Sequence, residues 1–138
     1  MSTTRQLILN QLEIVLKAVS SVKYVELERS IPIDLDTLPL PCVFVYSGKE
    51  NRVKDERAVI GKETWDWEVS LEIWTNGNVE SIIGEIHSAL WTNRSLGGYS
   101  VMTIRDSIEG IYVIDEDSDT KSIILNYIIT YRHALGIM

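Results

Sequence analysis

The chain of 138 residues contains one cysteine, Cys42, and two histidines. A single thiol cannot form an intramolecular disulfide and cannot build a zinc cage from thiolates. His87 and His133 have no second His or Cys at ligand spacing. Metal binding and nucleophilic catalysis would therefore need partners brought from afar, and we expect no metal and no cofactor.

Basic side chains are also scarce, since 13 Lys and Arg stand against 20 Asp and Glu, for a net charge of −7. A general nucleic-acid binder neutralises phosphates with Lys and Arg, so the average surface disfavours that class. No apolar run approaches the roughly 20 residues that span a bilayer, and residues 1–5 lack the features of a secretion signal. We expect a protein kept in the cytoplasm unless it leaves as part of a larger particle.

Catalytic motifs are missing as well. Residues 115–119 open with the D-x-D-x-D pattern of a calcium loop, but the sixth position is Thr120 instead of Gly and the twelfth is Asn126 instead of Glu. This segment is therefore interpreted as a solvated turn. Asp34 and Asp36 offer two nearby carboxylates for acid–base work, but their proline-bounded link is typical of a solvated loop. Without a G-x-S-x-G elbow or a phosphate-binding loop, the sequence predicts no enzyme.

The clearest positive feature is the strict alternation of polar and apolar residues from Thr64 to Trp74. This period predicts a long strand with one buried and one wet face, and it places Trp65 and Trp67 in the core. Trp74 breaks the alternation because it falls on the polar face. Trp74 and Trp91 are interaction candidates, and an aromatic at position 74 would cover a helix end or lie in a subunit contact.

Hydrophobic periodicity and turn residues divide the rest of the chain into alternating elements. Two amphipathic helices are expected, one at about Thr4 to Ser20 and one at Val79 to about Trp91 with Asn78 as a cap. Other strands are expected at 22–28, 42–47, 101–114 and 121–133. The order α-β-β-β-α-β-β predicts one α+β domain over residues 1–138, with two helices on a mainly antiparallel or mixed sheet of four to five strands.

The run Gly48 to Arg57 is almost wholly polar, with Val53 as its one apolar residue. It is predicted to be a solvated loop or the tip of a long hairpin. Its mixed charges disfavour a nucleic-acid grip and favour pairing with another protein, although an exposed hairpin without a partner fits equally well. The predicted contact residues are Trp74 and the charged members of the run: Lys49, Glu50, Arg52, Lys54, Asp55, Glu56 and Arg57.

The order of these elements resembles a family. A short helix and a proline-rich link lead into Pro41-Cys42-Val43-Phe44-Val45, and a charged hairpin leads into the W-x-W-x-V-x-L-x-I strand. One central helix follows, then Ile111-Tyr112-Val113 and the closing strand Ile128-Ile129-Thr130-Tyr131-Arg132. This arrangement is similar to that of tail terminator (tail completion) proteins of long-tailed bacteriophages, the minor tail protein U-like group. The resemblance covers most of the chain and involves no diagnostic motif.

The resemblance implies a non-enzymatic virion protein that caps the head-proximal end of the tail tube as a hexameric ring. Such a ring ends tube growth and presents a surface for head joining. The implied partners are further copies of the chain, the tail tube protein and head–neck proteins, with DNA only as passing cargo and no membrane. The alternatives are a head–tail connector or neck protein, a cytoplasmic protein-binding adaptor, and a small-molecule-binding or hydrolytic domain that uses Asp34, Asp36 and the acidic turn.

Overall fold

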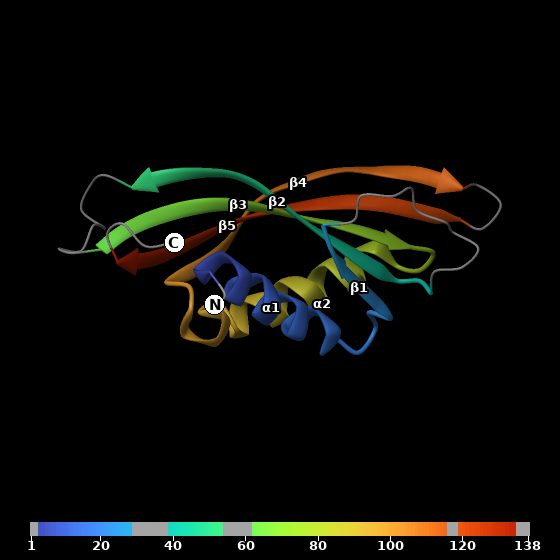
Figure 1. The fold of residues 1–138 in the computed structure, drawn as a ribbon. Helices are drawn as coiled ribbons and strands as arrows, with labels where there is room; N and C mark the ends of the chain where they lie inside the picture. The colour runs from blue at the N-terminus through green and yellow to red at the C-terminus, as the bar shows by residue number, and fades with distance from the viewer. Residues whose placement is uncertain (1–2, 29–38, 54–61, 116–118, 135–138) are drawn as a thin grey trace.

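Five strands form one sheet with two helices on one of its faces, as the computed structural model shows for residues 3–28, 39–53, 62–115 and 119–134 (Figure 1). The strand order is β1-β2-β3-β5-β4, with β1 parallel to β2 and every other pair antiparallel. The predicted α+β class and element order are confirmed. The elements are α1 (Thr4–Lys17), β1 (Tyr24–Leu27), β2 (Cys42–Val53), β3 (Lys62–Thr75), α2 (Val79–Thr92), the 3-10 turn η1 (Leu96–Gly98), β4 (Met102–Asp115) and β5 (Thr120–Ala134).

Both helices begin at a side-chain cap. Thr3 Oγ1 accepts a 3.1 Å hydrogen bond from the backbone N–H of Gln6, and Asn78 Oδ1 accepts one of 3.1 Å from that of Ser81. Each cap satisfies a backbone donor that the first helical turn leaves unpaired. No helix in the described part of the chain is long and apolar enough to cross a membrane.

The core lies between the helices and the sheet, and β3 is the central strand. Trp67, Val69, Leu71 and Ile73 are buried on the helix-covered face, while Trp65 is only half-buried. The predicted alternation is therefore confirmed. The same core takes the alternate residues of β5 and the apolar stripes of the two helices: Ile123, Leu125, Tyr127, Ile129, Tyr131, Ile8, Leu12, Leu16, Ile82, Ile86 and Leu90.

Strand β2 is longer than the sequence predicts. Cys42 to Val45 are all fully buried, which confirms a strand start covered on both faces. The strand then continues to Val53, so Lys49, Glu50 and Arg52 lie in a strand and not in a loop. Pairing with β3 continues past an irregularity between Ser47 and Glu50, and this pairing satisfies the backbone of an otherwise polar segment. Lys54, Asp55, Glu56 and Arg57 lie outside the described residues.

The two sides of the sheet differ in how their edges are covered. The short strand β1 pairs only with Cys42–Val45, so no strand of the described chain lies outside β2 beyond Val45. At the opposite side, β4 is an edge strand along its whole length. The sheet extends beyond the helix layer at both ends (Figure 1). Unpaired strand edges are templates for pairing with another chain.

Candidate subunit interface

Exposed apolar side chains gather around the start of β4. Six large hydrophobic residues are exposed in the part of the chain that the structure describes, and Ile14 on α1 is the one that lies elsewhere. Trp91 and Ile104 line one pocket, whereas Ile104 and Ile108 pair with Ile128 and Leu125 and so lie on opposite faces of β4. Clustered exposed apolar residues mark an interaction site more often than scattered single residues do. We call the other five the β4 edge patch: Trp91, Tyr99, Val101, Ile104 and Ile108.

The loop that carries part of this patch is held by hydrogen bonds. The backbone oxygen of Arg94 accepts 2.9 Å bonds from Ser100 Oγ and from Thr103 Oγ1. The Arg94 guanidinium lies 4.6 Å from the Trp91 ring centre, so one face of the indole carries a cation–π contact. Because the loop is already held in place, less conformational entropy is lost when a partner binds to it.

A pocket of about 240 Å³ opens beside the patch, and His87, Trp91, Ile104, Arg105 and Tyr127 line it with Thr103. His87 Nδ1 lies 3.2 Å from the Tyr127 hydroxyl. Burial, aided by the charge of Arg105, lowers the pKa of His87 from its usual 6.5. Burial also raises the pKa of Tyr127 to about 12. At neutral pH its hydroxyl is therefore uncharged and can donate or accept a hydrogen bond.

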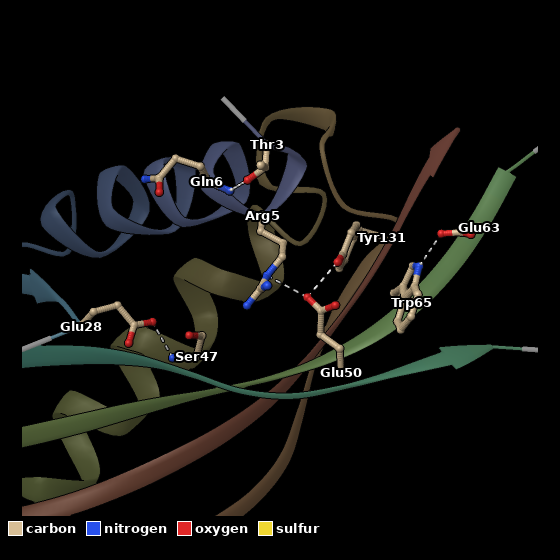
Figure 2. Close-up of polar contacts among 9 residues, drawn as sticks. All are labelled: Thr3, Arg5, Gln6, Glu28, Ser47, Glu50, Glu63, Trp65 and Tyr131. Carbon is tan, nitrogen blue, oxygen red and sulfur yellow. Dashed lines mark hydrogen bonds and ion pairs between the residues drawn. The ribbon is translucent and has the colours of Figure 1, made fainter. Parts of the chain in front are cut away.

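The charged residues of β2 do not all face outward. Glu50 turns toward α1, where its Oε1 lies 2.8 Å from Arg5 Nε and accepts a 2.8 Å hydrogen bond from the Tyr131 hydroxyl (Figure 2). Lys49 and Arg52 are exposed on the same strand. Of the predicted contact residues that the structure describes, Lys49 and Arg52 thus remain available, while Glu50 serves an internal contact.

The contacts of Glu50 join three elements. Arg5 comes from α1, Tyr131 from β5 and Glu50 from β2, and the Arg5 guanidinium also lies 4.9 Å from the Trp67 ring centre. The Nε–H of Arg5 makes no hydrogen bond of good geometry, so its short contact with Glu50 is an electrostatic one. Burial and the bond to Glu50 raise the pKa of Tyr131 well above its usual value of 10.0. This group connects α1, β2 and β5 through polar contacts.

Trp74 lies apart from the β4 edge patch. Its ring is half-buried and packs edge to face on Phe44 at 6.3 Å, and its Nε1–H donates a 2.6 Å hydrogen bond to Glu72. Tyr24 packs on the other side of the same cluster, 6.4 Å from Phe44. Trp74 therefore covers part of the sheet face that the helices leave free.

Most of the candidate catalytic residues lie outside the part of the chain that the structure describes. Asp34, Asp36 and Asp117 lie outside the described residues, and Asp119 forms an exposed ion pair of 3.5 Å with Lys121. Among the described residues, no group of three or more His, Cys, Asp or Glu side chains has a geometry that would hold a metal ion. The acidic turn connects β4 to β5, as the sequence predicts.

An open groove of about 740 Å³ lies between α1 and α2. Small side chains line its α2 wall, including Ser81, Gly84 and Ser88, and Glu80 and Glu85 are the charged groups of its lining. The Glu85 carboxylate accepts a hydrogen bond from the hydroxyl of Ser21. The described lining of the groove contains no Lys, Arg or His side chain.

The patch was not predicted as a unit, because its members come from a helix end, a loop and a strand. Trp91 was the only one singled out in the sequence, as an aromatic at the end of an amphipathic helix. The alternating signal of β4 is weak, because irregularities interrupt the strand after Arg105, Glu109 and Val113. Exposure of Ile104 and Ile108 follows from the edge position of β4, which only the tertiary structure defines.

Comparison with known proteins gives limited information. No protein-family model and no curated protein matches the sequence. Among solved structures, one similar chain comes from a structure described as the virion of a native gene transfer agent (GTA) particle. The match covers 91% of this chain and 92% of that chain at 14% identity, with a TM-score of 0.43. A likeness of this degree does not bear on function.

Proposed function

We propose that this chain is a structural subunit of a phage-like virion: a tail terminator that forms a ring on the head-proximal end of the tail tube and ends tube growth. The resemblance in element order to tail terminator proteins supports the proposal.

The observation that carries the proposal is the exposed apolar surface along an unpaired strand edge. The interior of the domain is well packed, yet Trp91 and Ile104 are each 54% exposed beside the start of β4. Trp is enriched among the residues that dominate binding energy at protein interfaces. A free edge adds backbone hydrogen bonds to this apolar contact area when another strand joins it.

The charge of the chain suits a ring through which DNA passes. A net charge of −7 per subunit gives a strongly acidic assembly. Each phosphate that a basic lumen neutralised would hold the duplex by counterion release, so an acidic protein lets DNA slide. The ring is thus expected to have DNA as passing cargo. We also expect it to bind no cofactor.

Two other interaction roles remain as alternatives. A head–tail connector would also form rings, but it would bind the head portal and leave tube length unchanged. A protein-binding adaptor would form complexes of defined small stoichiometry and no rings. Finding genes for a major tail protein and a tape measure protein beside this gene would favour the terminator, since tail genes are expected together.

Electron microscopy of the purified protein tests the proposal. The protein is imaged alone and then after mixing with tail tubes assembled from the major tail protein of the same particle. Rings in the first sample and capped tube ends in the second are expected. Tubes grown in the presence of the protein should also be shorter than tubes grown without it.

The absence of both rings and capped ends would contradict the terminator role. Rings that bind isolated heads and ignore tube ends would favour the connector. The variant Ile14→Ser is a useful control, because it removes an exposed apolar residue of α1 that lies outside the β4 edge patch. This variant should still form rings and cap tubes.

A further inference from the structure

We propose that neighbouring subunits join by strand addition, with the β4 edge of one copy pairing antiparallel to the free segment Gly48–Val53 of β2 in the next copy. This inference rests on the proposed self-association and names the two surfaces that form it. The partner is a second copy of this chain. The contact is heterologous, because each subunit offers two different edges.

The topology provides both edges on opposite sides of one sheet. No described strand lies outside β4, and none lies outside β2 beyond Val45. Three antiparallel pairings separate β2 from β4 within a subunit, so the two strands run in opposite directions. When a second copy is placed beside the first with its strands in the same directions, its β2 lies antiparallel to the β4 of the first copy. The helix-covered faces of both sheets are then on the same side.

The boundary of the free segment is marked by a hydrogen bond. Glu28 Oε1 accepts a 2.8 Å bond from the backbone N–H of Ser47, directly beyond the residues that pair with β1 (Figure 2). The side chain of Glu28 thus occupies the last donor before the free segment. About six residues remain for a partner strand, which is the length of an average strand.

The charges of the two edges are complementary. Lys49 and Arg52 are exposed on β2, whereas Asp106 and Glu109 are exposed on β4. Arg52 shares the face of Trp65 and Glu109 shares the opposite face with Ile124, so the complementarity belongs to the two edges as a whole. Opposite charges on two surfaces that meet favour association, and like charges disfavour it. Pairing of β4 with β4 of another copy would bring the acidic residues toward each other. The charges therefore favour β2 as the partner of β4.

Apolar burial acts at the same contact. Ile104 and Ile108 alternate with the acidic residues along β4 and are both about half exposed in the single subunit. A strand laid beside β4 would remove water from these side chains, and burial of apolar surface is the main driving force of association. A heterologous contact of this kind closes into a ring when the rotation between subunits divides a full turn.

Charge reversal on each edge tests the pairing. One variant carries Lys49→Glu and Arg52→Glu, and the other carries Asp106→Lys and Glu109→Lys. Each variant alone should lose at least about tenfold in self-association affinity, because the contact then sets like charges against each other. Mixed in equal amounts, the two should assemble again with subunits in alternating order. Light scattering after size-exclusion chromatography measures both effects.

Cysteine cross-linking provides a second readout on the same pairing. Asn51→Cys and Glu109→Cys proteins carry their thiols on the same face of the sheet, because Asn51 is in register with Asp66 and Thr130, and Glu109 with Ile124. Mixed under mild oxidation, the two proteins should give a disulfide-linked heterodimer that neither gives alone in comparable yield. Cys42 is fully buried and should not take part. Lys17→Cys mixed with Glu109→Cys is the matched control, since Lys17 is exposed on α1 away from both edges.

The outcomes separate this inference from the proposed function. A parent chain that stays monomeric and caps no tubes contradicts the ring itself. A parent that forms rings while the β2 charge-reversal variant assembles equally well contradicts only the edge pairing. Self-linking of Glu109→Cys as the main product would indicate β4-to-β4 contact and would also overturn it. Circular dichroism and urea unfolding confirm that each variant is folded.

Discussion

The hydroxyl of Tyr131 in β5 donates a 2.8 Å hydrogen bond to the carboxylate of Glu50 in β2, across the intervening strand β3 (Figure 2). Arg5 of α1 contacts the same carboxylate. These two contacts connect β2, β5 and α1 at a point where β2 extends beyond β1. The outer part of β2, on which the proposed edge pairing depends, is therefore tied to the core by a polar contact.

We predict that removing this carboxylate destabilises the domain. Glu50→Ala removes the hydrogen-bond acceptor of the Tyr131 hydroxyl and the negative charge beside Arg5. It should lower the free energy of unfolding by about 1–3 kcal/mol. Glu50→Gln keeps an acceptor and should cost less. Urea unfolding followed by tryptophan fluorescence measures both. Glu68→Gln, at an exposed position of β3, is the control, and a loss there equal to that of Glu50→Gln would refute the assigned role.

Stability should fall at high pH because of two tyrosines. The pKa of Tyr127 is raised to about 12 and that of Tyr131 is raised further, from 10.0. The unfolded chain therefore loses these protons first, and the stability they contribute is complete below pH 10 and lost as pH rises through the folded pKa values. Each should lower the free energy of unfolding by about 1.4 kcal/mol per pH unit in that window.

Unfolding curves of the Tyr127→Phe and Tyr131→Phe variants check this pH dependence. Each variant should show a shallower decline above pH 10 than the parent. Tyr99→Phe, which alters an exposed ring, should decline as the parent does. A direct titration of tyrosinate absorbance should show a late phase in the parent that the two Phe variants reduce, and an unchanged late phase in both variants would contradict the prediction.

Two glycine substitutions should have opposite effects. Gly97 has a φ of +70°, and a Cβ there would lie 2.9 Å from the side chain of Gln11, so Gly97→Ala should destabilise by about 1 kcal/mol or more. Gly84 lies inside α2 with nothing within 4 Å of an added Cβ. Gly84→Ala should therefore stabilise by about 0.5–1 kcal/mol. Thermal unfolding of both variants measures the two stability changes. Changes of the same sign would refute the prediction.

The helix caps should contribute measurably. Asn78→Ala removes the acceptor for the Ser81 N–H and should lower the free energy of unfolding by about 0.5–2 kcal/mol. Asn76→Ala is a matched control in the preceding turn, two residues earlier and exposed. Urea midpoints that shift equally for the two variants would show that the cap bond is not responsible.

The β4 edge patch should control self-association without controlling folding. Ile104→Ser removes a side chain that is 54% exposed, and it should weaken assembly while leaving the free energy of unfolding within about 0.5 kcal/mol. Ile14→Ser changes a residue that is 59% exposed on α1 and should leave assembly intact. Sedimentation velocity compares the two. Equal loss of assembly in both variants would remove the patch from the interface.

Local patterns were sufficient for the elements with a strong period. Thr64 to Trp74 alternates strictly, and the strand forms there because any other register would expose its buried half. The expected start at Val79 and cap at Asn78 are confirmed, while the first helix ends at Lys17, three residues before the expected Ser20. The extension of β2 to Val53 had no such signal. Its polar residues pair because β3 is long enough to continue beside them.

The sequence by itself determined the α+β class, the element order and the inward face of β3, because hydrophobic periodicity is a local property of the chain. The tertiary structure decided which strands lie at the edges and which charges remain exposed. Glu50 and Lys49 are neighbours of opposite charge in one polar run, yet the fold turns Glu50 to Tyr131 and leaves Lys49 exposed. That difference depends on which strands and helix lie across from each side chain, and no local pattern encodes it.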